Sequence, residues 1–393
     1  MQRSNSRWPV HADHAAAISA ARSLVPLLAE RAARAEADRT ISAETIEDIR
    51  SNGLFHLCSP REFGGSELGI ATFVETAAEI SAGCGSTGWV YAVLAGHNWT
   101  LSLLPIEAQQ EVFADPNSLV ASVIHLSSKP PVRVAGGFLI EDAFGRYCSG
   151  VDHANWILAG SEVAIDEHHK EPRYFLIPRA EFAITDDWYA AGLRGTGSKS
   201  VKTDRVFVPE HRSCSLTEVA QGTAPGIVHH DSALYRLPFR ETQRLQLVGV
   251  PIGIARGALA HCTENYGKHH GAPGRDQSED SRAAFVRLAR ASVEFDAAAS
   301  LVFSDALALD SQTGNTSRSA LDRARRLRNI AYAAQECRRI VCVLFEASGA
   351  RGLLDGNELQ RIWRDANAAA AHVAFVRDKV DLPFARALCG LDE

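Results

Sequence analysis

Several features common in other protein classes are missing from this chain of 393 residues. It has no run of about eighteen apolar residues that could cross a membrane, and its first residues lack the apolar core of a signal peptide. Its eight cysteines are scattered, with no CxxC pair and no His/Cys cluster at zinc spacing. We therefore expect a cytoplasmic protein with reduced thiols, no membrane partner and no metal.

Concentrated charge of one sign is also missing. The formal net charge is −6 and no basic block occurs, so we expect no nucleic-acid partner. No strand-associated GxGxxG is present, which argues against a pyridine-nucleotide site. Between Asp365 and Asp378 there is no carboxylate, and His372 is the one ionisable group in the alanine-rich helix that we expect there.

What is present indicates a mostly helical protein with a β insertion. Hydrophobic residues make up 46 % of the chain and charged residues 22 %, as in an ordinary globular protein, and alanine dominates several long segments. Apolar residues recur at helical spacing in residues 13–36, and a second helix is expected from a Ser42 cap to Gly53. Helical periodicity returns from about residue 245.

The middle of the chain has short β-rich runs between Gly, Pro and Asp clusters, the pattern of a small antiparallel β domain. These runs are residues 132–140, 156–164, 174–177 and 201–208. We predict three domains: an N-terminal helical domain (1–118), a β domain (119–213) and a C-terminal helical bundle (214–393).

Five segments, in this order, carry a resemblance to a known family. They are GLFHLCSPREFGG (53–65), GCGSTGWV (83–90), CSGVDHANW (148–156), GLRGTGSKSVKTDRVFVPEHR (192–212) and NELQRIWRDANAAAAHVAF (357–375). Together they resemble the acyl-CoA dehydrogenase superfamily. They are more similar to the flavin-dependent two-component monooxygenases of that fold, such as the 4-hydroxyphenylacetate hydroxylase oxygenase component. The resemblance spans about residues 41–375.

The resemblance implies an oxygenase component. It would take reduced FMN or FAD from a separate flavin reductase, react with O2 through a C4a-hydroperoxyflavin, and hydroxylate a small phenolic or indolic substrate. Relatives of this fold are usually homotetramers. Where the dehydrogenase branch has a catalytic glutamate, this chain has His372, which favours oxygen chemistry over α-proton abstraction.

Ser149 is the first catalytic candidate. Reduced flavin that has reacted with oxygen must keep its N5 proton, and a short hydroxyl can hydrogen-bond there without filling the oxygen site. The resemblance assigns this role to Ser149. The alternative is that Ser149 caps a turn beside Gly150.

His372 is the second catalytic candidate. Its ordinary pKa lies near neutrality, so it could stabilise a nascent peroxide as imidazolium or help to deprotonate an aromatic hydroxyl or ring N–H. A hydrogen-bonded core histidine is the alternative. Sequence does not separate these roles.

The resemblance assigns further residues to the ligands. Cofactor contacts fall on Ser149, Gly150, His153, Trp156, Thr196, Gly197, Ser198 and Arg275, and substrate contacts on His97 and His372. A tight turn equally explains residues 196–198. Trp156 could belong to the β core, and His153 could lie on an exposed turn. For Arg364 and Asp365, in the superfamily's Arg-Asp-Ala position, we predict salt bridges.

Residues 125–134 and 144–147 depart from the family pattern and are expected to border the cavity, so the substrate cannot be transferred from the best-known members. Three alternatives stay open. The chain could be an acyl-CoA dehydrogenase with its base on another helix, an amine N-oxygenase acting on an amino sugar, or a catalytically silent helical scaffold.

Overall fold

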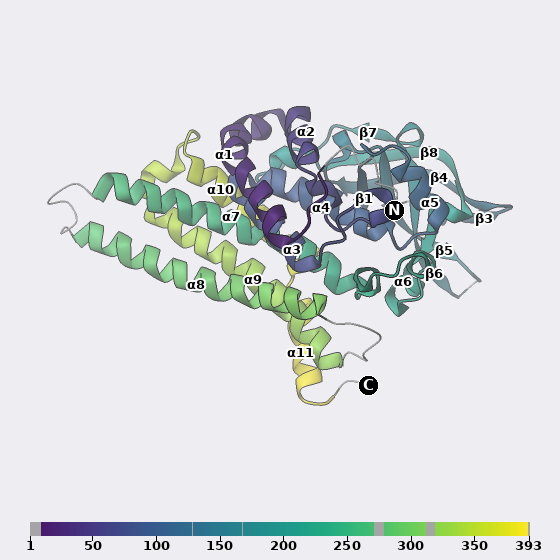
Figure 1. The fold of residues 1–393 in the computed structure, drawn as a ribbon. Coiled ribbons are helices and arrows are strands. Elements are labelled where there is room, and N and C mark those ends of the chain that lie inside the picture. Colours follow the sequence, from purple (N-terminus) through teal and green to yellow (C-terminus); the bar gives the residue numbers. More distant parts are fainter. Residues whose placement is uncertain (1–8, 128, 167, 271–278, 312–318, 392–393) are drawn as a thin grey trace.

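Helices occupy both ends of the chain and strands its middle, as the sequence predicts. The computed structural model describes residues 9–127, 129–166, 168–270, 279–311 and 319–391. Figure 1 shows the strands gathered at one end of the molecule, with the long C-terminal helices extending away from them. The predicted fold class is therefore confirmed.

The N-terminal helices begin and end at the expected signals. They are α1 (His14–Asp38), α2 (Ala43–Ser51), α3 (Ile70–Gly83), α4 (Gly85–Leu101) and α5 (Ile106–Phe113). The Ser42 side chain accepts a hydrogen bond from the backbone N–H of Thr45, which caps α2. Gly53 follows α2 at φ +70°, the left-handed conformation that a glycine adopts without strain.

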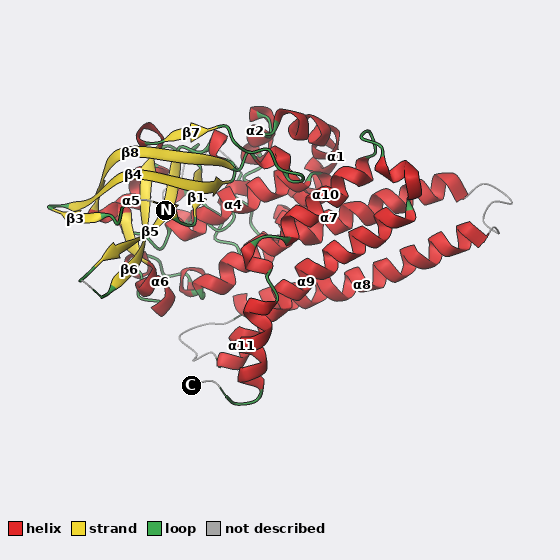
Figure 2. Ribbon diagram, turned by 180° about the vertical axis from the view of Figure 1, so that it is seen from behind, coloured by secondary structure: helices red, strands yellow, loops and turns green. Residues whose placement is uncertain are grey.

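The central strands form two sheets. One has the order β1 (Val120–Val123), β5 (Trp156–Ala164), β6 (Lys170–Pro178) and β9 (Ser213–Ser215). The other has the order β2 (Leu126–Ser127), β4 (Gly137–Cys148), β8 (Lys199–Pro209) and β7 (Ala183–Thr185), with β3 (Val132–Val134) beside β4. Figure 2 shows both sheets gathered at the same end.

The expectation of a purely antiparallel β unit is wrong in one place, because β1 pairs with β5 in parallel. A parallel neighbour needs a long connection between its two strands, and here β2, β3 and β4 lie in between. The sequence pattern missed β1, which follows the N-terminal helices directly. It also ended β4 too early, since this strand continues to Cys148.

The C-terminal part is a bundle of long helices. After the short α6 (Leu216–Gln221) come α7 (Phe239–His270), α8 (Glu279–Asp310), α9 (Ala320–Ala347), α10 (Glu358–Ala370) and α11 (Asp378–Leu388). By length and composition Phe239–Lys268 could span a membrane, but 67 % of its most apolar window is buried, as in a core helix of a soluble protein.

The structure places His372 outside the alanine-rich helix in which we expected it. The α10 helix ends at Ala370, and His372 caps a short 3₁₀ turn, Val373–Phe375.

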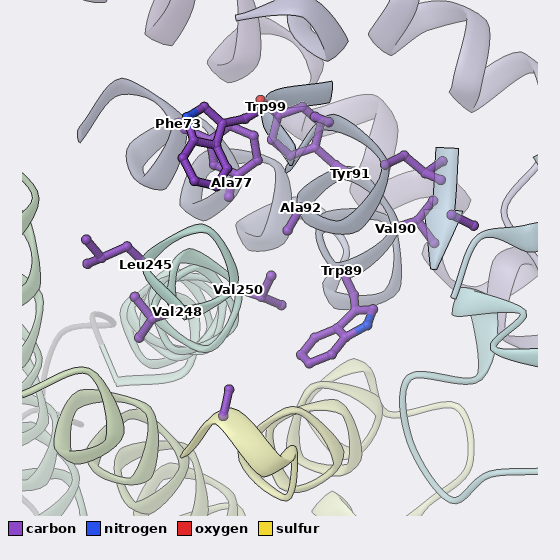
Figure 3. Packing of buried hydrophobic residues seen from close by; sticks show 14 of the residues in the cluster. Phe73, Ala77, Trp89, Val90, Tyr91, Ala92, Trp99, Leu245, Val248 and Val250 are labelled. Atoms are coloured by element: carbon purple, nitrogen blue, oxygen red, sulfur yellow. The ribbon is translucent and has the colours of Figure 1, made fainter. Parts of the chain in front are cut away.

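The two halves of the helical region meet where α7 crosses α3 at close range. Gly249, Gly253 and Gly257 recur every four residues and so face the same way on α7. A Cβ atom at Gly253 would lie 2.2 Å from the Ala78 carbonyl oxygen of α3, and one at Gly249 would lie 2.5 Å from that of Val74. The absence of side chains therefore lets the two backbones touch. Figure 3 shows Phe73 of α3, Trp99 of α4 and Leu245 of α7 in the core around this crossing.

Substituting Gly253 tests this contact. We expect Gly253→Ala to lower the free energy of unfolding by about 1–3 kcal/mol, because the new methyl group overpacks the crossing. Gly267→Ala is the matched control on the same helix, since no atom of the described residues lies within 4 Å of the added Cβ. Alanine's better helix propensity should make that change neutral or stabilising by up to about 1 kcal/mol. Equal denaturant midpoints for both variants would contradict the close approach.

Candidate active site

A cavity of about 670 Å³ lies between the β sheets, α4, α7 and the C-terminal end of α10. This volume suits a small-molecule site, since such sites enclose about 300–1,000 Å³. Of the residues predicted to form the active site, the structure brings together Ser149, His372, His97, Thr196 and Ser198 on its wall. They come from segments far apart in the sequence.

Two helical faces form much of the wall. The α4 face consists of Trp89, Ala92, Val93, Gly96 and His97, at the three- and four-residue steps of one helix side. In Figure 3, Trp89 lies on the opposite side of α4 from Tyr91 and Trp99, which pack in the core. The α4 helix therefore divides its aromatic residues between core and cavity.

The second face is on α7 and is more polar. It consists of Arg240, Gln243, Arg244, Gln246 and Leu247. Nothing in the family resemblance pointed to these residues. Helical periodicity could have grouped them, but their exposure to a cavity depends on the packing of α7 against the β region.

His372 is held at the point where α10 ends. The side-chain amide of Gln335 on α9 donates to the carbonyl oxygens of Ala370 at 2.9 Å and Phe375 at 3.3 Å, one on each side of His372. The imidazole meets Trp89 edge to face, with ring centroids 5.2 Å apart. Burial, together with a smaller effect of the positive charge of Arg244, lowers the pKa of His372 from 6.5 to about 4. The ring is therefore neutral at physiological pH.

The hydrogen bonds of His372 also indicate which nitrogen carries the proton. Its Nδ1 accepts a hydrogen bond from the Ala374 backbone N–H at 3.3 Å. A neutral imidazole that accepts at Nδ1 has its hydrogen on Nε2. His372 can therefore donate a hydrogen bond through Nε2–H.

His97 has the opposite arrangement. Its Nδ1 lies 2.8 Å from the Val120 carbonyl oxygen, which can only accept, so Nδ1 carries the hydrogen. Burial lowers the pKa of His97 to about 4, although the bond to Val120 acts against this shift. His97 is therefore neutral and has an unprotonated Nε2, which can accept a hydrogen bond.

Ser149 begins a chain of hydrogen-bonded hydroxyl groups. Its Oγ accepts from the Trp89 indole N–H at 3.1 Å and lies 2.7 Å from the Ser198 Oγ. Ser198 lies 2.6 Å from the Thr196 Oγ1, which donates to the Leu193 carbonyl oxygen at 2.8 Å.

The direction of this chain follows from its ends. Thr196 uses its one hydrogen on the Leu193 carbonyl, so Ser198 must donate to Thr196 and Ser149 must donate to Ser198. Ser149 also accepts the Trp89 N–H. Its oxygen therefore keeps one lone pair and no free hydrogen, and it can act only as an acceptor toward a ligand in the cavity.

The Arg-Asp pair of α10 positions the far end of this chain. Arg364 pairs with Glu36, which confirms the predicted salt bridge. Asp365 forms none; its buried carboxylate accepts the Leu193 backbone N–H at 2.6 Å, and burial raises its pKa to about 6. Gly192 allows this contact, because a Cβ there would lie 2.1 Å from the Arg364 carbonyl oxygen.

The other predicted cofactor residues that the structure describes do not line the cavity. Gly150 and Gly197 adopt positive φ in turns beside the hydroxyl chain. His153 contacts the Ile41 carbonyl oxygen at 3.0 Å, and Trp156, at the start of β5, packs under the Arg212 guanidinium. Arg275 lies outside the described residues. The assignment of these residues to the flavin stays a prediction.

Two residues beside Ser149 reach the cavity through an irregularity in β4. The pairing of β4 with β8 shifts register between Gly145 and Cys148. Such a bulge redirects side chains, and Arg146 and Tyr147 line the cavity. In the sequence, only their departure from the family pattern indicated that these two residues border the cavity.

Known proteins resemble this chain over most of its length. Residues 12–115 match the family model "Acyl-CoA dehydrogenase, N-terminal domain" and residues 245–377 match "Acyl-CoA dehydrogenase, C-terminal domain". The chain is 34 % identical to the flavin-dependent monooxygenase oxygenase subunit HsaA of Mycobacterium tuberculosis over 92 % of both chains. It is 31 % identical to the oxygenase component of FADH(2)-dependent resorcinol hydroxylase of Rhizobium sp., over 93 % of this chain and 92 % of the relative.

Solved structures show the same relationship. The crystal structure of HsaA from M. tuberculosis superposes with a TM-score of 0.89 at 32 % identity, covering 97 % of this chain and 100 % of HsaA. XiaF from Streptomyces sp., solved with FADH2, gives 0.85 at 27 % identity, covering 96 % of both chains. The chain therefore belongs to the family of oxygenase components of flavin-dependent monooxygenases built on the acyl-CoA dehydrogenase fold.

Proposed function

We propose that this protein uses reduced flavin and O2 to hydroxylate a small phenolic or indolic compound. The observation that carries the proposal is the cavity itself, which unites an acceptor hydroxyl, Ser149, with two neutral histidines of opposite tautomer. Relatives support the substrate class, since one is named a resorcinol hydroxylase, another a p-hydroxyphenylacetate 3-hydroxylase and a third an indole-3-acetate monooxygenase.

The residues present fit a reduced flavin. The cavity is large enough for an isoalloxazine ring and a small aromatic molecule, and the small side chains of Ala368 and Ala371 are part of its wall. Ser149 offers its lone pair, Thr196 and Ser198 hold that hydroxyl in place, and Trp188 supplies an aromatic wall. When bound, reduced FMN or FAD supplies the electrons that activate oxygen.

Ser149 would hold the proton on flavin N5. Because its own hydrogen is committed to Ser198, its oxygen would accept a hydrogen bond from the flavin N5–H and could not donate in competition. Loss of that proton would release hydrogen peroxide instead of transferring oxygen to the substrate. The hydroxyl chain therefore favours productive use of the reduced flavin.

The two histidines would have complementary roles in oxygen transfer, one toward the substrate and one toward the oxygen. His97, through its unprotonated Nε2, accepts a hydrogen bond from the substrate hydroxyl or ring N–H and so raises the electron density of the ring. His372 donates from Nε2–H to the developing negative charge on oxygen. The low pKa of His372 argues against an imidazolium in the free enzyme.

An acyl-CoA dehydrogenase is not supported. That reaction needs a carboxylate base, and no Asp or Glu lines the described cavity wall. The nearby Asp365 is already used by the Leu193 N–H. The retained hydroxyl chain and both histidines also disfavour a silent scaffold.

The remaining expectations concern partners and location. We propose that a separate reductase supplies the flavin, since the relatives are named oxygenase subunits or components. A homotetramer is supported by exposed apolar side chains on α8, such as Val286 and Val293, which a neighbouring subunit could cover. A cytoplasmic location is supported by eight unpaired cysteines.

Histidine NMR tests the assigned protonation states. Because burial depresses both pKa values from 6.5 to about 4, His97 and His372 should stay neutral as the pH falls from about 8 to 5, and protonate only below that range. Nitrogen-15 shifts should show Nδ1–H for His97 and Nε2–H for His372, with signals assigned from His97→Gln and His372→Gln. Titration near 6.5 or reversed tautomers would refute the assignment.

Ser149→Ala tests the role of the hydroxyl chain. The protein is mixed anaerobically with reduced FMN and then with oxygen. The parent should form a long-lived species that absorbs differently from reduced and oxidised flavin. In the variant, this species should have a shorter lifetime, and more hydrogen peroxide should be released at the expense of product. Ser161→Ala, on β5 outside the cavity wall, is the control. Equal coupling of product to flavin in both would rule out this role, and no such species in the parent would reject the function itself.

His372→Ala should slow oxygenation at least about tenfold, the lower range for a residue that assists proton placement. His230→Gln is the matched control, because this buried histidine contacts Gln109 and lies off the cavity wall. Single-turnover product formation measures the rate, and thermal unfolding checks the fold. An unchanged rate in His372→Ala would make it a packing residue.

A further inference from the structure

The cavity wall carries an unbalanced charge. Three arginines, Arg146, Arg240 and Arg244, line it, and no aspartate or glutamate is present on its described wall. This occurs in a protein whose net charge is −6. A concave surface with charge of one sign attracts ligands of the opposite sign.

The arginines differ in whether the protein itself satisfies them. Arg146 lies 3.9 Å from the Asp187 carboxylate and stacks over the Phe144 ring, so it has partners. Arg240 is exposed. Arg244 has a buried Nη1 with no hydrogen-bond partner among the described residues, and burial lowers its pKa. The Arg244 side chain as a whole is half-buried and lines the cavity, and leaving its Nη1 without a partner costs free energy that a ligand would recover.

A second unpaired donor lies on the same helix. The side chain of Gln246 is only 3 % exposed, it lines the cavity, and its Nε2 has no partner among the described residues. Its neighbour Gln243 is engaged, because it hydrogen-bonds with Tyr174. Arg244 and Gln246 therefore line the cavity with one buried N–H donor each that lacks an acceptor among the described residues, and both side chains would have to turn for these nitrogens to meet a ligand.

We propose that Arg244 and Gln246 form a subsite for an ionised carboxylate carried by the aromatic substrate, with Arg240 attracting it from the rim. A planar guanidinium matches the geometry of a carboxylate. Gln246 packs against Gly96, the residue before His97, since a Cβ at Gly96 would lie 2.9 Å from its Oε1. Binding the acid at this point places the substrate next to His97.

This inference rests on the proposed function and adds the substrate class: acidic phenols or indoles over their neutral counterparts. The same donors could instead meet an anion of the flavin, either its phosphate or its reduced ring. The substrate carboxylate, the flavin phosphate and the reduced flavin ring are all anions. They can be told apart by which ligand binds more weakly when Arg244 is changed.

The test compares matched pairs that differ by a carboxylate: p-hydroxyphenylacetate with p-cresol, salicylate with phenol, and indoleacetate with skatole. Dissociation constants are measured by calorimetry on the full-length protein with and without flavin, together with KM for turnover. In at least one pair the acid should bind at least about tenfold more tightly, as expected when one charge-assisted pair is gained. Arg244→Gln should abolish that preference, and Gln246→Leu should reduce it.

Arg146→Gln is the control, because it removes a cavity arginine that already has a partner. It should keep the preference for the acid. If no acid in the panel outbinds its neutral partner, or if Arg244→Gln keeps the preference, the subsite is refuted.

Measurements of flavin binding distinguish the substrate carboxylate from the flavin phosphate and the flavin ring. Reduced FMN and reduced riboflavin should bind Arg244→Gln as they bind the parent. Weaker binding of FMN alone would assign Arg244 to the phosphate, and weaker binding of both to the ring; either result overturns the substrate assignment. Failure of the proposed function would be distinct, since the parent would then give no long-lived species with reduced FMN and oxygen.

Discussion

The close crossing of α3 and α7 is the constraint on which the rest of the structure depends. Gly249 and Gly253 bring the two backbones into contact, and no other residue type has room there. Because α4 follows α3 after a single residue, this crossing also determines how far the α4 face lies from the α7 face. One face carries Trp89 and His97 and the other carries Arg244, so the width of the cavity is set in the helical core.

A second constraint connects the α10 helix to the β region. The buried Asp365 carboxylate holds the Leu193 N–H, and the Leu193 carbonyl ends the hydroxyl chain that orients Ser149. The same helix ends just before His372, which packs on Trp89, the donor at the other end of that chain. The acceptor at Ser149 and the donor at His372 are thus positioned by one connected set of contacts, which explains how a site drawn from distant segments remains ordered.

Much of the fold could be predicted because it depends on local signals. The Ser42 cap, the glycine after α2 and the apolar periodicity of the long helices all act within a few residues. Ser149 and His372 could be proposed from ordered motifs that resemble a family, and His97 from the polar groups that this family often has on the same helix; all three reach one cavity. Prediction failed where pairing between distant segments decides the outcome, as in the parallel contact of β1 with β5 and the bulge before Cys148.

The sequence by itself therefore determined the order of helical and β segments, the family and the residue types available for oxygen chemistry. Only the tertiary structure decided what those residues can do. His97 and His372 are chemically identical in the sequence, yet the Val120 carbonyl and the Ala374 N–H give them opposite tautomers. Arg244 is an ordinary charged residue in the sequence, and only packing leaves its Nη1 buried without a partner among the described residues. Hydrogen-bond direction and desolvation arise from neighbours that are distant in the chain, so no local pattern contains them.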